Sequence, residues 1–180
     1  MHHSLRFYGE HQRPILRLYM AMAKLTGLPL VGGLVRLAAN IYGQRQHGNY
    51  VLTQEQAERI VEASTNVALG PCSCRQTFHN CDAPVAAEIV VGVGAEVFPE
   101  IRTGEFRQVS KEEAKEVLRQ CHQGRLVHTL SKCRGDFYAI CSCCTCCCVP
   151  LRLRQKHDIK YALTKNDDVV EGFIGGKTYS

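Results

Sequence analysis

A run of cysteines in the C-terminal part of the chain sets the tightest limit on how this sequence can fold. Residues 141–148 have the sequence CSCCTCCC, so six of eight consecutive residues carry a thiol. Cysteines this close in the chain cannot all form disulfides with one another, because a disulfide needs a specific separation and orientation of its two Cα–Cβ bonds. A hydrophobic core does not need so much sulfur, so the run predicts a site for a thiophilic metal.

The other cysteines form a second, more open group and two isolated positions. Cys72, Cys74 and Cys81 make up the group, whereas Cys121 and Cys133 stand apart. The total of eleven is odd, and no secretory signal is recognised near the start of the chain. Because disulfides are rare in reducing compartments, we expect a cytoplasmic protein whose thiolates bind metal.

Apart from its sulfur, the composition is that of an ordinary globular protein. The chain has 180 residues, of which 45% are hydrophobic and 22% charged, which suits one domain with a short appendage. The formal net charge is only +5, and the basic residues are scattered along the chain. Two 4Fe-4S clusters, each carrying about −2 with its thiolates, would nearly neutralise that charge. A nucleic-acid partner is therefore not expected.

The N-terminal part of the chain differs in character from the rest. Residues 1–49 are predicted to form an apolar and basic helical segment, and residues 50–180 a cluster-binding domain. Within the first segment, residues 15–39 are strongly apolar and are interrupted by glycines and a proline near residue 27. This pattern predicts two short helices joined at that point.

Two alternatives stay open for this helical segment. It contains Arg17, Lys24 and Arg36, so no charge-free run reaches the ~18 residues that a membrane span requires. The helices can pack on protein, either on the domain itself or on a partner subunit. They can also lie on the inner surface of a membrane through residues 13–45, because basic residues beside apolar faces are typical of interfacial helices.

The rest of the chain predicts an α+β fold, with a small mixed sheet, helices and cluster-binding loops that follow strands. Two capping boxes, at Thr53 with Gln56 and at Ser110 with Glu113, predict helices that run to about residues 64 and 123. Strands are predicted at residues 66–69, 88–93, 125–130 and 137–140. The first of these leads into the group of three cysteines, and the last leads directly into the dense run.

The spacing of the cysteines favours an iron–sulfur cluster over zinc. Cys141, Cys144 and Cys147 are three residues apart, and a similar spacing supplies three corners of a 4Fe-4S cube. Structural zinc sites more often use two separated pairs of ligands. We expect these three residues to face one cluster. The interleaved thiols of the run, at 143, 146 and 148, are then free to complete a second cluster with Cys72, Cys74 and Cys81.

At this point the chain resembles a known family, the 4Fe-4S ferredoxin-like iron–sulfur proteins of anaerobes. The resemblance covers about residues 50–163 and depends on five segments, which are ALGPCSCR at 68–75, NCDAP at 80–84, SKEEA at 110–114, LVH at 126–128 and ICSCCTCCC at 140–148. It implies cluster binding and electron transfer. Members of the family often carry a further cysteine where this chain has Glu88, and many continue into a ferredoxin module, which is not expected here.

We therefore predict an iron–sulfur protein with two 4Fe-4S clusters that transfers electrons, as a carrier or as a subunit of an anaerobic oxidoreductase. An electron-transfer role is favoured over an enzyme. The predicted ligands are Cys72, Cys74, Cys81, Cys141, Cys143, Cys144, Cys146, Cys147 and Cys148, with Cys133 as a replacement candidate. One larger cluster that binds or reduces a small molecule, and a zinc or copper site without redox function, are the alternatives. The expected partners are redox proteins or further subunits, with a homo-oligomer as another alternative.

Three further residues carry weaker expectations. Cys121, near the end of a predicted helix, is expected to be a small buried side chain. His128 lies in a predicted strand and is expected to be a core or surface histidine, not a ligand. Arg75 follows Cys74 directly, where its charge could offset that of a cluster and raise the reduction potential.

Overall fold

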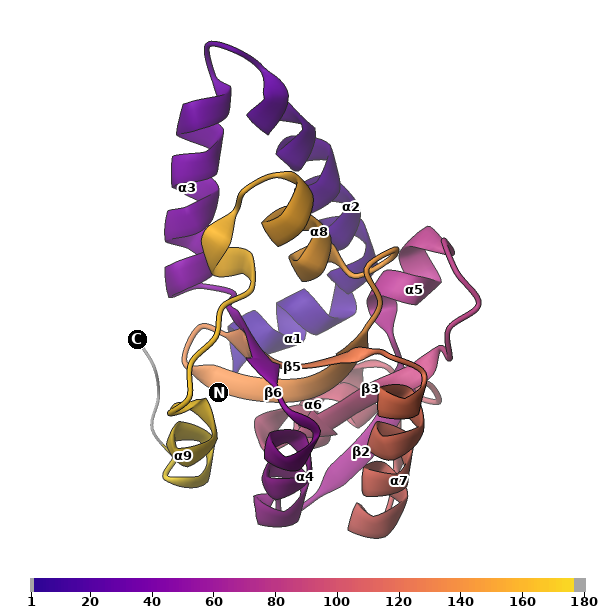
Figure 1. The fold of residues 1–180 in the computed structure, drawn as a ribbon. Helices are drawn as coiled ribbons and strands as arrows, with labels where there is room; N and C mark the ends of the chain where they lie inside the picture. The colour runs from indigo at the N-terminus through magenta and orange to yellow at the C-terminus, as the bar shows by residue number, and fades with distance from the viewer. Residues whose placement is uncertain (1, 177–180) are drawn as a thin grey trace.

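A six-stranded antiparallel sheet lies at the centre of the protein, in a computed structural model that describes residues 2–176 (Figure 1). In spatial order the strands are β1 (Asn49–Leu52), β5 (Val127–Cys133), β6 (Asp136–Cys143), β3 (Ala86–Val91), β2 (Val67–Pro71) and β4 (Arg107–Gln108). Every neighbouring pair is antiparallel, where a mixed sheet had been expected. The α+β class is confirmed.

Helices cover both faces of this sheet. They are α1 (His3–Glu10), α2 (Gln12–Ala23), η1 (Lys24–Gly27), α3 (Gly32–Arg45), α4 (Gln54–Ala63), α5 (Ser73–Phe78), α6 (Val93–Ile101), α7 (Lys111–Gln123), α8 (Val149–Lys156), η2 (Lys160–Ala162) and α9 (Val169–Ile174). In Figure 1, α4, α7 and α9 lie below the sheet, whereas α2, α3 and α8 lie above it.

The two helix starts predicted from capping boxes are confirmed. The hydroxyl of Thr53 accepts a hydrogen bond from the Gln56 backbone at 3.1 Å, and the Gln56 side chain accepts one from the Thr53 backbone at 2.9 Å. The Ser110 hydroxyl likewise accepts from the backbone of Glu113 at 3.1 Å. These bonds satisfy amide groups that have no partner within the helix, so they fix where α4 and α7 begin.

Strand alternation divides the buried side chains between the two faces. Leu69, Ile89, Leu130 and Ile140 belong to one hydrophobic cluster, which includes side chains of α4, α7 and α9. On the opposite face, Ala68, Val90 and Ala139 pack with residues of α1 and α6. Because successive side chains of a strand point to opposite faces, each buried strand serves both clusters.

The N-terminal helices contribute to the second of these layers. Leu5 and Tyr8 of α1 belong to the cluster that contains the sheet residues on that face. In α2, Leu16 and Met20 pack against Val149 at the start of α8. No helix among the described residues is both long and apolar enough to cross a bilayer. The N-terminal segment therefore forms a cover over one face of the sheet.

Candidate metal centres

Four cysteines form a compact group at the end of β6. Their sulfur atoms all lie within 4.8 Å of one another, and the residues are Cys81, Cys144, Cys146 and Cys147, which we call the rim group. The sulfur of Cys81 lies 3.6 Å from that of Cys144 and 3.8 Å from that of Cys147. Four thiols at such short range satisfy the first requirement of a tetrahedral metal site.

Local structure explains how the rim group forms. The strand β6 ends at Cys143, and the chain then turns through residues 144–147 before α8 begins. Cys81 approaches from the loop between α5 and β3. The backbone of Asn80 in that loop donates a hydrogen bond to the Cys147 sulfur at 3.3 Å, and its side chain donates to the Cys146 carbonyl at 2.9 Å. Asn80 thereby fixes the loop against the turn.

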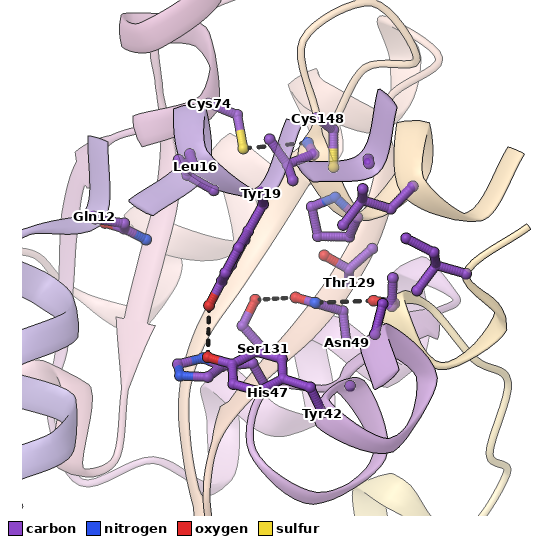
Figure 2. Close-up of a pocket in the computed structure, with 18 of the residues that line it drawn as sticks. Gln12, Leu16, Tyr19, Tyr42, His47, Asn49, Cys74, Thr129, Ser131 and Cys148 are labelled. Atoms are coloured by element: carbon purple, nitrogen blue, oxygen red, sulfur yellow. Dashed lines mark hydrogen bonds between the residues drawn. The ribbon is translucent and has the colours of Figure 1, made fainter. Parts of the chain in front are cut away.

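Five further cysteines line a cavity of about 700 Å³ between the sheet and the N-terminal helices (Figure 2). They are Cys72, Cys74, Cys141, Cys143 and Cys148, which we call the cavity group. Electrostatic interactions link Cys72 to Cys74, Cys74 to Cys148, and Cys148 to Cys143. Cys141 instead approaches the hydroxyl of Ser131, at 3.9 Å. Four of the five thiols thus form a connected set.

Each group contains one thiol that is poised to lose its proton. Hydrogen bonds from Cys148 and Cys72 hold the pKa of Cys74 well below its ordinary value, against the opposing effect of burial. Burial also opposes ionisation of Cys144, but hydrogen bonds, the largest of them from Cys146, bring its pKa down to about 6. Because metals bind the thiolate and not the thiol, a lowered pKa favours metal binding at Cys74 and Cys144.

The two groups adjoin each other directly. Cys143 of the cavity group is bonded to Cys144 of the rim group, and Cys147 of the rim group is bonded to Cys148 of the cavity group. Consecutive Cα atoms are only about 3.8 Å apart. Arg75 lies buried between the groups, where it donates one hydrogen bond to the carbonyl of Ser142 and interacts with the thiol of Cys144. Its fixed charge is therefore shared by both sites.

The cysteines group differently from the predicted pattern. The spacing had placed Cys141 with Cys144 and Cys147, but Cys141 lies in the cavity group. The predicted strand ended at residue 140, whereas β6 continues to Cys143. In a strand, residues two apart point to the same face, so Cys141 and Cys143 both face the cavity. Cys81, expected beside Cys72 and Cys74, lies instead in the rim group.

Glu88 is the one carboxylate among the residues that line the cavity. It lies directly across from Cys141 in the pairing of β3 with β6 and is 1% exposed. One carboxylate oxygen accepts a hydrogen bond from the Ser73 backbone at 3.5 Å, and the other has no partner among the described residues. Burial raises the pKa of Glu88 to about 7. A buried oxygen without a partner, facing thiols, is a further candidate ligand atom.

The two isolated cysteines lie outside both groups. Cys121 packs with Ala87 and Leu126 in a small apolar cluster. Cys133 is buried in the sheet, where its sulfur lies 3.6 Å from the His47 ring and burial raises its pKa to about 11. A thiol with so high a pKa ionises less readily than Cys144 does.

The far end of the cavity carries polar groups that the sequence did not point to. The hydroxyl groups of Tyr19 and Tyr42 lie 2.6 Å apart, and the ring of Tyr42 stacks on that of His47 (Figure 2). Nearby, Ser131 donates a hydrogen bond to the side chain of Asn49 at 2.8 Å. No sequence signal links these residues, because the N-terminal helices and the sheet meet only in the folded chain.

Comparisons with known proteins add no assignment: no family model, curated protein or solved structure matches the chain.

The separations of the sulfur atoms indicate which kind of metal centre each group of thiols suits. In the rim group, separations of 3.6 and 3.8 Å are close to the value of about 3.8 Å expected between ligands around one ion with bonds of about 2.3 Å. A cube would require these sulfurs to move apart, because four irons and four sulfides lie between its ligands. The thiols of the cavity group instead border an open volume of about 700 Å³.

Proposed function

We propose that the protein is an iron–sulfur protein that transfers single electrons through two adjoining thiolate centres, one at the rim group and one at the cavity group. The observation that carries this proposal is the division of nine cysteines into two sets joined by the peptide bonds 143–144 and 147–148. An iron–sulfur cluster supplies reversible one-electron chemistry. Two centres so close together favour exchange of an electron between them and onward to a redox partner protein or subunit.

The residues of the chain have distinct roles in this proposal. In the cavity group, the proposed ligands are the connected thiols Cys72, Cys74, Cys143 and Cys148. Cys141 and Glu88 are alternative ligands. The backbone of Val149 at the start of α8 donates a hydrogen bond to the Cys74 sulfur at 3.5 Å. Hydrogen bonds to ligand sulfur and nearby positive charge both raise the reduction potential of a cluster, since they stabilise the more negative, reduced state. Arg75 supplies that charge.

The deciding experiment measures metal and acid-labile sulfide in protein purified without oxygen. About eight irons and eight sulfides per chain are expected for two 4Fe-4S centres. Cys74→Ser and Cys144→Ser should each remove about half of the iron, because each variant removes a low-pKa ligand from one group only. Cys121→Ser is the matched control and should leave the iron content unchanged. Zinc or copper without sulfide would refute the proposal.

A specific observation favours a second assignment for the rim group. Its sulfur separations suit a single tetrahedral ion, so the rim can hold zinc while a cluster occupies the cavity. In that case the protein should contain about four irons, four sulfides and one zinc. Cys144→Ser should then remove the zinc and leave the iron in place.

A second candidate function is that the cavity centre binds or reduces a small molecule. The cavity is lined mostly by apolar side chains, has thiols at one end and carries Tyr19, Tyr42 and His47 at the other. Apolar walls with a few convergent polar groups are typical of ligand sites. A small molecule that alters the spectrum of the reduced protein, with Tyr19→Phe abolishing the change, would favour this function over simple electron transfer.

A further inference from the structure

The helices α2 and α3, with the turn between them, form a hairpin that exposes much of the apolar surface of the protein. Of the fourteen large apolar side chains that are exposed among the described residues, ten belong to this hairpin. They are Leu18, Met22, Leu25, Leu28, Leu30, Val31, Leu34, Leu37, Ile41 and Tyr42. Single exposed apolar residues are normal on a soluble protein, but such a concentration marks an interaction surface.

The exposed residues follow helical periodicity. Leu18, Met22 and Leu25 repeat at intervals of four and three residues, on the side of the chain opposite to the buried Leu16 and Met20. In α3, Leu34, Leu37 and Ile41 repeat at intervals of three and four. Each element therefore has an apolar stripe on its solvent side, in addition to the contacts that hold it to the domain.

The tip of the hairpin is its most exposed part. Figure 1 shows the connection between α2 and α3 projecting away from the sheet. Leu30 in this connection is 93% exposed, and Leu28 and Val31 beside it are also exposed. A projecting turn of apolar side chains is suited to shallow insertion into a soft surface, whereas a protein partner would need a matching concave pocket.

The charge of the hairpin indicates which surface it meets. No acidic residue occurs between His11 and Gln54, a stretch that contains five arginines and lysines. Arg17, Lys24 and Arg45 are exposed and form no ion pair among the residues described. Positive charge beside exposed apolar stripes complements the anionic headgroups and the acyl boundary of a membrane.

We propose that the hairpin at residues 12–45 binds the surface of an anionic lipid bilayer, with the tip inserted and the basic side chains at the headgroups. The inference does not depend on the identity of the metal. Membrane binding would also place the cavity near the bilayer. Met22 and Leu34 are exposed and line the cavity, so the opening of the cavity lies between α2 and α3. A hairpin seated on a bilayer brings that opening to the lipid.

Flotation of the full-length, metal-loaded protein with vesicles tests this proposal. Binding is expected to vesicles of phosphatidylcholine with phosphatidylglycerol, to weaken as salt is raised and to be poor with phosphatidylcholine alone. Arg17→Gln with Lys24→Gln should weaken binding about 25-fold, at about fivefold for each charge near the surface. Arg125→Gln with Lys165→Gln is the matched control, with the same change in net charge, and should bind as the natural protein does.

A second pair of variants tests how much the exposed apolar side chains contribute to vesicle binding. Leu30→Glu should weaken binding at least tenfold, because a charge at the tip opposes insertion. Ile174→Glu replaces an exposed apolar residue of α9 and should have no effect. Bound metal of any kind, measured in every variant, shows that the fold and metal site persist, which separates this proposal from the proposed function.

Three results would overturn the inference. The first is no flotation with anionic vesicles at low salt, and the second is flotation that none of the hairpin variants reduces. The third is a lipid-free dimer, seen by light scattering, that Leu30→Glu converts to a monomer while flotation is absent. That last result would assign the hairpin to contact between two copies of the chain.

Discussion

Replacing His128 by glutamine is expected to remove about 2 kcal/mol from the loss of folding stability between pH 8 and pH 5. His128 lies in β5 and is 2% exposed. Its Nδ1 atom is 3.1 Å from the Ser142 hydroxyl, and its Nε2 atom has no hydrogen-bond partner among the described residues. Burial, with a smaller effect from His122, lowers the pKa of His128 to about 4. The folded protein therefore keeps this ring neutral.

The size of the effect follows from proton linkage. An unfolded histidine takes up its proton near pH 6.5, so between about pH 6.5 and 4 the unfolded chain binds more protons than the folded one. The stability due to neutral His128 is full above pH 6.5 and is lost as pH falls through 4. With these two pKa values, the expected loss between pH 8 and pH 5 is about 2 kcal/mol.

Urea unfolding at pH 8 and pH 5 measures this loss directly. His128→Gln should reduce the pH-dependent change in the free energy of unfolding by about 2 kcal/mol, because glutamine keeps a hydrogen-bonding side chain but does not titrate. His122→Gln, at the exposed end of α7, is the control and should retain most of the change. An unchanged pH dependence in His128→Gln would contradict the assignment of this loss to His128.

Three further predictions concern packing and the charge between the two centres. Leu5→Ala should cost about 2–5 kcal/mol of stability in thermal or urea unfolding, whereas Leu30→Ala should cost almost nothing, since Leu5 is 1% and Leu30 is 93% exposed. Gly94→Ala should destabilise strongly, because its Cβ would lie 2.0 Å from a backbone oxygen of β6, whereas Gly33→Ala meets nothing within 4 Å and should stabilise α3 by about 0.5–1 kcal/mol. Arg75→Gln should lower the reduction potential measured by protein-film voltammetry, and an unchanged potential would contradict the role given to its charge.

Much of the secondary structure could be predicted because its causes are local. The capping boxes at Thr53 and Ser110 involve residues three apart, so the starts of α4 and α7 follow from the sequence. The end of β6 could not be found in the same way. Its continuation to Cys143 depends on pairing with β5, where Val127 lies opposite Cys143. As a consequence of that pairing, Cys141 lies apart from Cys144 and Cys147.

The α+β class and the thiol-rich candidate metal site follow from the sequence alone, because capping, alternation and the density of cysteine act over a few residues. Which thiols meet depends instead on tertiary packing. Cys81 joins Cys144 across more than sixty residues, and the cavity exists because α2 and α3 cover the sheet face to which Cys141 and Cys143 point. Such contacts depend on how distant elements pack, and no local spacing encodes that packing.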